Sequence, residues 1–361
     1  MKYILLIACI FAFFCSGCSA NQSNSQTNVK DKEVGTMNTQ KALTQSVKLN
    51  SGYSMPILGL GTWTLRGKTC EDAVYTAIKC GYRLIDTARY YGNEETVGKG
   101  IKKAIDEGIV NREEIFVTSK IMPGDYGRAD KAVDDSLLSL NLGYIDLMLI
   151  HQPGANDEEV YKALEHKVRE GKIRSIGISN YYTPQDFERI NRIAEITPAV
   201  VQNENHPYYQ NTALQNYLKK YKTVIESWYP LGGRGNTEKI LGNKTIDEIA
   251  KHYGKTPAQI VIRWQTQAGY VVIPGSSNSA HIKENADIFD FELTDDDMSE
   301  IAKINGLECE INDKIPLIKI TWPKEFDSKI NVLTNTVSES LKQIAQQNSD
   351  YIKIFYEEKK L

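Results

Sequence analysis

Short apolar runs alternate with amphipathic stretches along most of this chain. The runs are rich in Ile, Val and Leu and are typical of strands buried in a parallel sheet. The stretches between them carry apolar residues three and four positions apart, which predicts helices. The expected strands are 83–86, 115–120, 145–150, 173–179, 199–202, 223–227, 270–273 and 288–291. The expected helices include 131–142, 160–170, 184–194, 257–268 and 279–286.

Turn signals complete this pattern. A glycine turn at 50–52 predicts a hairpin at the start of the folded part, and residues 58–63 (LGLGTW) predict a further strand. About eight strand–helix units in about 250 residues is the size of a (β/α)8 TIM barrel. A doubly wound sheet is the alternative, but no Gly-x-Gly-x-x-Gly follows the first strand. We therefore expect an α/β barrel over 47–310 that begins with the hairpin and is followed by a C-terminal extension, 311–361, of unassigned role.

The N-terminus has the pattern of an export signal. Lys2 precedes the apolar run 3–14, which is too short to span a bilayer comfortably. The run ends in Cys15-Ser16-Gly17-Cys18, which resembles a bacterial lipoprotein cleavage box with Cys18 as the lipidated residue. Cys15 departs from that pattern, where Leu is usual, so cleavage near Ala20 is the alternative. The sequence predicts a signal peptide at 1–18, export and a lipid anchor in the membrane; the chain is cytoplasmic if the signal is not used.

The stretch 19–46 is rich in Asn, Ser, Gln, Thr and Lys and predicts a flexible tether. Over the whole chain of 361 residues, 41% are hydrophobic and 25% charged, which is ordinary for a globular protein. The net charge of -3 argues against a nucleic-acid partner. No Cys/His spacing matches a zinc site, so no metal is expected.

Polar residues stand at the ends of successive expected strands. The first strand ends at Asp86 and is followed by Tyr90 and Tyr91, and the next ends at Lys120. His151 follows the third strand, and Ser179-Asn180 close the fourth. In a barrel these ends meet at one mouth, where loops carry the chemistry. Each residue alone has a structural explanation, but together they predict one site.

These residues carry a specific resemblance. Asp86 and Tyr91 in IDTARYYGNE, Lys120 in FVTSK and His151 in LMLIHQP are similar to the catalytic tetrad of the aldo-keto reductase family. The similarity extends in order over about 47–305 and includes GTW at 61–63, GISN at 177–180, WYPL at 228–231 and IPGS at 273–276. The chain thereby resembles the bacterial branch of 2,5-diketo-gluconate-reductase-like and aldehyde reductases.

The resemblance implies an NAD(P)H-dependent oxidoreductase that reduces aldehydes, ketones or keto sugars to alcohols. Carbonyl reduction needs a hydride donor, which no side chain supplies. It also needs an acid, and a phenol is too weak an acid near neutral pH without help. We expect Tyr91 to be the acid, Lys120 to lower its pKa and Asp86 to hold Lys120 by an ion pair. His151 would orient the substrate oxygen.

The resemblance also implies cofactor and substrate contacts. The expected cofactor residues are Thr62, Ser179, Asn180, Gln202, Trp228, Leu231, Ser276, Glu284 and Asn285. Trp63, His151 and Trp228 would contact a small carbonyl substrate, with Tyr90 as a further wall. Gln152 stands where the family often has Trp, which makes the pocket more polar.

The residues expected to meet the 2′-phosphate of the cofactor depart from the family pattern. Gly275 and His281 replace the Lys and Arg that usually meet the 2′-phosphate of NADPH. Ser276, Ser277, Asn278 and a protonated His281 are possible substitutes. The family implies NADPH, and the missing cations leave NADH as the alternative.

Two further questions stay open at this level. The complete tetrad favours an enzyme over a non-catalytic nucleotide-binding or sensing module on the same barrel. Free NADPH is not expected outside the cytoplasm, so an exported copy would need to bring its cofactor with it.

Overall fold

Eight short strands, rich in the β-branched and apolar residues that favour a buried sheet, pair side by side in chain order. The computed structural model describes residues 45–304. Every neighbouring pair in this sheet is parallel. The strands are β3 (Leu60–Gly61), β4 (Leu84–Asp86), β5 (Phe116–Ile121), β6 (Ile145–Ile150), β7 (Ile173–Ser179), β8 (Val200–Glu204), β9 (Val224–Trp228) and β10 (Val271–Val272).

The first and last strands meet and close the sheet. Leu58 forms a parallel bridge with Val272. The Gly59 amide donates to the Val272 carbonyl at 2.9 Å, and the Val272 amide donates to the Ile57 carbonyl at 2.9 Å. Closure leaves no open edge, so the (β/α)8 barrel is confirmed and the doubly wound alternative is wrong.

One expected strand is wrong. Residues 288–291 form neither strand nor helix. Their apolar side chains pack on the helices, with Ile288 fully buried. The closed barrel offers them no partner, because β10 is already paired with β9 and with Leu58. The eighth strand of the barrel is instead β3, at the N-terminal end of the sheet, within the strand expected at 58–63.

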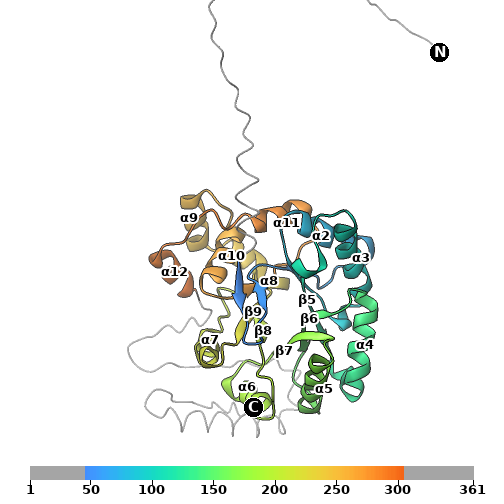
Figure 1. Cartoon of the computed structure of the whole chain (residues 1–361). Helices are drawn as coiled ribbons and strands as arrows, with labels where there is room; N and C mark the ends of the chain where they lie inside the picture. The colour runs from blue at the N-terminus through green and yellow to red at the C-terminus, as the bar shows by residue number, and fades with distance from the viewer. Residues whose placement is uncertain (1–44, 305–361) are drawn as a thin grey trace, which may run out of the picture.

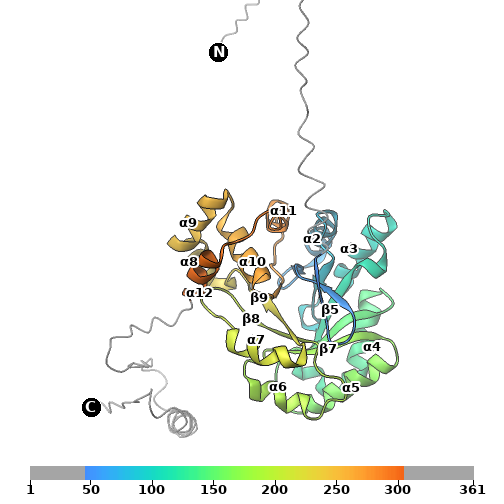
Figure 2. The ribbon, with the colours of Figure 1, turned by 60° about the vertical axis from the view of Figure 1, so that its left-hand side comes forward.

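Helices surround the barrel and follow the strands along the chain (Figure 1). Figure 2 shows α2, α3 and α4 on one side of the strands and α8, α9 and α12 on the other. They are α2 (Gly67–Lys79), α3 (Glu94–Asp106), α4 (Ala129–Leu140), α5 (Asp157–Arg169), α6 (Pro184–Asn191), α7 (Thr212–Leu218), α8 (Gly233–Leu241), α9 (Lys244–Tyr253), α10 (Pro257–Gln267), α11 (Ser279–Ala286) and α12 (Asp295–Ala302). Short 3-10 helices are η1 (Arg89–Tyr91), η2 (Arg112–Glu114), η3 (Pro123–Arg128) and η4 (Lys219–Tyr221).

The N-terminal hairpin closes the bottom of the barrel. β1 (Ser46–Lys48) and β2 (Ser54–Pro56) pair antiparallel, as predicted. Leu49 and Met55 of this hairpin are buried in one cluster with Leu84, Leu147 and other inward-facing strand residues. This apolar layer fills the lower interior, so polar chemistry is confined to the opposite, carboxyl-terminal mouth.

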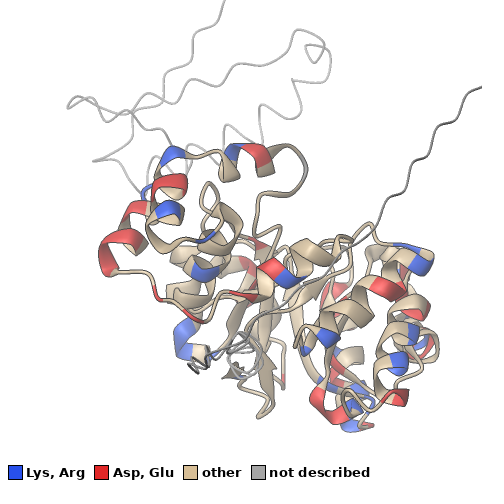
Figure 3. Cartoon of the chain, turned by 90° about the horizontal axis from the view of Figure 1, so that it is seen from above, with Lys and Arg blue, Asp and Glu red and all other residues tan. Residues whose placement is uncertain are grey.

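Lys, Arg, Asp and Glu positions lie mainly on the outer helices, as the coloured ribbon in Figure 3 shows from above. None of the described helices is long and apolar enough to cross a membrane. The predicted signal peptide with Cys18, the tether up to residue 44 and the C-terminal extension lie outside the described residues.

Candidate active site

The carboxyl-terminal mouth collects polar side chains from six consecutive strands. Because all strands run parallel, their ends meet at one face. Asp86 ends β4, Lys120 lies near the end of β5 and His151 directly follows β6. Ser179 ends β7, Gln202 lies within β8 and Trp228 ends β9.

Tyr91 is brought to this mouth by a short loop that Asn93 holds in place. The buried Asn93 amide nitrogen donates to the carbonyls of Thr62 at 3.0 Å and Leu65 at 3.1 Å. Its amide oxygen accepts from the Thr87 hydroxyl at 2.6 Å. Asn93 follows η1 and therefore connects the residue after β4, Thr87, to the loop after β3. These contacts hold η1, which carries Tyr91, at the mouth.

Lys120 is the centre of the site. Its ammonium group donates to Asp86 Oδ1 at 2.7 Å, to the Thr87 carbonyl at 2.9 Å and to the Tyr91 phenol oxygen at 3.2 Å. These three contacts use all three ammonium hydrogens. Lys120 has an exposed fraction of 0% and Asp86 of 2%, so the ion pair is shielded from water. The phenol oxygen accepts from Lys120, which leaves its own hydrogen free for an acceptor in the cavity.

The pKa values follow from burial and from this ion pair. Burial lowers the pKa of Lys120, but attraction by Asp86 and Tyr91 outweighs it, so the pKa lies above the ordinary value. Burial raises the pKa of Asp86, while Lys120 and Gln202 oppose the rise. Burial also raises the pKa of the Tyr91 phenol, and Lys120 acts in the opposite direction. The expected lowering by Lys120 is present, but burial exceeds it, so Tyr91 is a protonated donor at neutral pH.

His151 is a neutral imidazole. Burial, and then the charge of Lys120, lowers its pKa to about 3. Its backbone carbonyl accepts from the Asn180 side-chain amide at 2.8 Å, which fixes the strand end that carries it. The buried Nδ1 atom has no hydrogen-bond partner among residues 45–304. A neutral ring can donate one hydrogen bond without adding charge to the mouth.

A cavity of about 860 Å³ opens over these groups. Aromatic rings wall it: Trp63 lies 4.7 Å from the Tyr91 ring and stacks on Tyr90 at 6.0 Å, centroid to centroid. The His151 ring lies edge-on to Tyr91 at 5.7 Å. Gln152 lines the same cavity and is exposed. The mouth thus combines an apolar wall with a few polar groups, the usual composition of a small-molecule site.

The lining of the cavity also carries the polar groups that a dinucleotide would need. Ser179, Asn180 and Gln202 supply hydroxyl and amide groups beside the flat Trp228 ring at one end. The same cavity continues through Leu231 and Ser276 to Glu284 and Asn285, the residues expected at the adenosine end. Donors and acceptors for a carboxamide and for a ribose are therefore both present in the lining of one cavity.

Two of the expected site residues do not line the cavity. Lys120 is fully buried and reaches the cavity wall only through its contact with the Tyr91 phenol oxygen. Thr62 is fully buried, and its hydroxyl donates to the Asp86 carbonyl at 2.9 Å. The structure therefore gives the Thr62 side chain a partner in the protein, at the end of the strand that carries Asp86.

The far end of the cavity has little positive charge. Among the lining residues whose side chains the structure describes there is no Lys or Arg, and His281 is the one basic side chain that α11 contributes. Gly275 is packed against the barrel: a Cβ atom at this position would lie 2.9 Å from the Gly61 carbonyl oxygen. A lysine at Gly275 would therefore require a backbone shift in this chain.

Glu226 is a site residue that sequence reasoning missed. It lies on β9, fully buried, and accepts from Gln202 Nε2 at 2.7 Å. Gln202 Nε2 also donates to Asp86 Oδ2 at 2.8 Å. The sequence does carry a signal for Glu226. It stands two positions before Trp228 on the same strand, and alternate residues of a strand face the same side, here the barrel interior.

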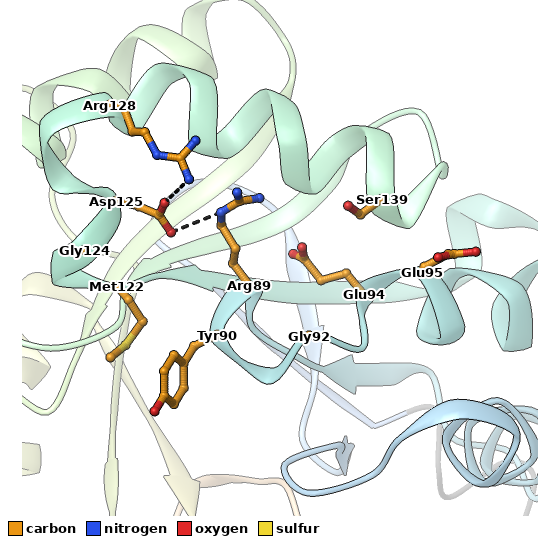
Figure 4. A pocket seen from close by; sticks show the side chains of 10 residues that line it. All are labelled: Arg89, Tyr90, Gly92, Glu94, Glu95, Met122, Gly124, Asp125, Arg128 and Ser139. Atoms are coloured by element: carbon orange, nitrogen blue, oxygen red, sulfur yellow. Dashed lines mark hydrogen bonds and ion pairs between the residues drawn. The ribbon is translucent and has the colours of Figure 1, made fainter.

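A second cavity, of about 720 Å³, lies beside the first (Figure 4). Tyr90 and Met122 line both cavities. Asp125 accepts from Arg89 at 3.0 Å and from Arg128 at 2.6 Å, and Figure 4 shows both guanidinium groups turned toward it. Asp135 also accepts from Arg89 at 3.1 Å and from Arg128 at 3.4 Å, so both guanidinium groups are already paired with carboxylates of the protein. Within residues 45–304 no cluster of three His, Cys, Asp or Glu side chains is arranged to hold a metal ion.

Comparison with known proteins gives a consistent match. Residues 57–306 match the model of the aldo/keto reductase family. The chain is 40% identical over 299 residues to the NAD(P)H-dependent D-xylose reductase I,II of Candida tropicalis, covering 72% of this chain and 92% of that protein. It is 43% identical over 264 residues to the methylglyoxal reductase DkgA of Escherichia coli K12, covering 72% and 93%. Among solved structures, MGS-M4, an aldo-keto reductase enzyme from a Medee basin deep-sea metagenome library, superposes with a TM-score of 0.69 at 42% identity, covering 72% of this chain and 95% of that one.

Proposed function

The chain belongs to the aldo/keto reductase family, and we propose that it uses NAD(P)H to reduce the carbonyl group of small aldehydes, ketones or keto sugars, with Tyr91 as the proton donor. The observation that carries this proposal is the contact between the Lys120 ammonium and the Tyr91 phenol oxygen at the cavity wall, 3.2 Å long. A Lys buried beside a Tyr is costly to maintain. A binding module that performs no proton transfer has no use for it.

The chemistry divides between cofactor and protein. A nicotinamide held by Ser179, Asn180 and Gln202 beside Trp228 would supply the hydride. His151 donates a hydrogen bond to the carbonyl oxygen and orients it. Tyr91 gives its proton to that oxygen as negative charge develops there. Lys120 then stabilises the phenolate, and Asp86 holds Lys120 in position.

The walls of the cavity support a small substrate. Trp63, Tyr90 and Trp228 enclose the space over Tyr91, and Gln152 adds a polar group at the rim. The relatives are named for D-xylose and methylglyoxal. Both compounds, together with 2,5-diketo-gluconate for the bacterial branch, therefore belong in the substrate panel.

The test is direct. The purified protein is mixed with NADPH or NADH and the panel, and the absorbance of the reduced cofactor is followed. Oxidation with at least one carbonyl compound is expected. Tight cofactor binding without oxidation of any member of a broad panel would instead favour the binding-module alternative.

We also propose that the chain is exported and anchored by a lipid on Cys18. This proposal rests on the sequence 1–18, outside the described residues. The expected result is that labelled fatty acid is incorporated into the wild-type chain and that the protein sediments with membranes. A Cys18→Ala variant should lose the label. If the wild-type chain is unlabelled and stays in the cytoplasmic fraction, the signal is not used.

A further inference from the structure

Glu226 is a buried carboxyl group that the proposed mechanism does not use. It lies in the middle of β9, opposite Gln202 of β8 and Val271 of β10 in the strand register. Its exposed fraction is 0%. Gln202 is its one hydrogen-bond partner, and its Oε1 atom has none among residues 45–304. No Lys or Arg in this part of the chain forms an ion pair with it.

A buried carboxylate without a direct cation is strongly disfavoured, so Glu226 holds a proton under ordinary conditions. Burial, and then repulsion by Asp86, raises its pKa to about 8, while Gln202 and Lys120 oppose the rise. The titratable groups that face it are Asp86 of β4, Lys120 of β5 and Tyr91 of η1. The neutral form leaves one negative and one positive charge, Asp86 and Lys120, balanced in the barrel interior.

The link between Glu226 and the site is Gln202. A Gln side chain carries two donor hydrogens on Nε2 and one acceptor oxygen. One hydrogen is directed to Asp86 Oδ2 at 2.8 Å and the other to Glu226 Oε2 at 2.7 Å. Both donors are therefore used within the protein. The carbonyl oxygen has no protein partner in residues 45–304, and Gln202 lines the cofactor end of the cavity.

We propose that Glu226 is a positioning residue: in its neutral form, and together with Asp86, it fixes the Gln202 amide so that only an acceptor is offered to the cofactor. The inference rests on the proposed function, because it assumes that Gln202 contacts the nicotinamide end. Glu226 itself contacts neither substrate nor cofactor in this proposal. Its effect on both passes through Gln202 and through the charge of the Asp86–Lys120 pair.

Ionisation of Glu226 would disturb both parts of this arrangement. A second negative charge would compete with Asp86 for Lys120 and raise the pKa of Tyr91 further. We therefore expect kcat to fall as pH rises through about 8. The same group makes the native state less stable relative to the unfolded chain as pH rises from 4.5 to about 8, because the unfolded carboxyl has already lost its proton there.

The test compares two substitutions in the full chain. Glu226→Gln is neutral at every pH and keeps an acceptor for Gln202, whereas Glu226→Leu is neutral and has none. Glu165→Gln is the matched control, since Glu165 is a buried carboxyl, 2% exposed, that accepts from the amides of Glu195 and Ile196 outside the site. For each variant we would measure the Kd of NADPH and NADH by tryptophan fluorescence, kcat and KM against pH, and the pH dependence of unfolding.

The expected results separate the two roles. Glu226→Leu should raise the cofactor Kd about tenfold at pH 7, as for a lost and unsatisfied hydrogen bond. Glu226→Gln should keep Kd within about threefold of wild type. It should also remove the decline of kcat near pH 8 and the loss of stability between pH 4.5 and about 8. Glu165→Gln should leave the pH profile of kcat unchanged.

Three results would overturn the inference. One is a Glu226→Leu variant that is folded and has the wild-type Kd. Another is a Glu226→Gln variant with the wild-type pH dependence of both kcat and unfolding. The third is a wild-type chain that binds neither cofactor, which would overturn the proposed function as well. A wild-type chain that binds cofactor but reduces no carbonyl would overturn the proposed function alone, since Kd and unfolding still report on Glu226.

Discussion

The Lys120 ammonium donates a 3.2 Å hydrogen bond to the Tyr91 phenol oxygen, although the two residues lie on different elements, β5 and η1. The bond directs a fixed positive charge at the oxygen on which negative charge appears when the proton leaves. Its direction also determines where the phenol hydrogen can go, which is into the cavity.

Removing the phenol should abolish most of the activity. We expect Tyr91→Phe to lower kcat by about 10²–10⁴-fold, the usual contribution of a positioned acid. The cofactor Kd should change little, because the ring and its contact with Trp63 remain. The free energy of unfolding, measured with denaturant, should fall by about 1–3 kcal/mol because the buried Lys120 loses one of its acceptors. Steady-state kinetics and fluorescence titration check this.

The neighbouring Tyr90 provides the comparison. Its exposed fraction is 62%, and it stacks on Trp63 without contacting Lys120. Tyr90→Phe keeps the stacked ring and should change kcat by less than about fivefold. Equal losses in the two variants would contradict the assignment of the proton donor to Tyr91.

The buried ion pair should show strong coupling in stability. Lys120→Met leaves Asp86 buried without its cation, and we expect a loss of about 3–5 kcal/mol in the free energy of unfolding. Asp86→Asn should also destabilise, because it leaves the ammonium uncompensated. The double variant should be more stable than the sum of the two losses predicts.

Denaturant unfolding at pH 7 measures all three variants. Additive losses would mean that the 2.7 Å contact contributes no coupling. Activity should be low in each variant. Lys120→Met and the double variant have no cation beside Tyr91, and Asp86→Asn removes the carboxylate that holds Lys120 in position.

His151 should make the protein less stable in acid. Its native pKa is about 3, against an ordinary value of 6.5. Between these values the unfolded chain holds one more proton than the native state, so stability falls as pH falls, by up to about 1.4 kcal/mol per pH unit. The difference between wild type and His151→Gln, followed from pH 7 to 4, isolates this contribution from that of other groups. A pH-independent difference would mean that His151 has the same pKa in the native and the unfolded state.

The cofactor preference should respond to a single added cation. His281 is exposed and lines the far end of the cavity, whereas Gly275 has no room for a side chain. His281→Arg should lower the Kd for NADPH about tenfold at pH 8 and leave that for NADH unchanged, because only NADPH offers a 2′-phosphate.

The control is Ser279→Arg, which adds the same charge to α11 at an exposed position outside the cavity. It should change both affinities by less than about threefold. If both arginines strengthen NADPH binding equally, the effect is one of general charge rather than of a contact at His281.

The sequence by itself determined the barrel and most of the mouth. The spacing of apolar residues and the turn residues are local features, so they predict strand and helix positions without the fold. The strands predicted at 145–150 and 173–179 match β6 and β7 residue for residue, and the helix predicted at 279–286 matches α11. Parallel strands place their ends at one face, so the sequence alone predicts that Asp86, Lys120 and His151 meet there.

Only the tertiary structure decided what depends on contacts between distant strands. Closure between Leu58 and Val272 left residues 288–291 without a strand partner, which no local pattern reveals. Burial depends on how the whole fold packs. It keeps the pKa of Tyr91 above its ordinary value, although the charge of Lys120 lowers that pKa. The register of β8 against β9 put Glu226 beside Gln202, and a one-residue slip would have turned that carboxyl outward. Strand pairing therefore decided the full membership of the site, because it alone sets which side chains share the interior.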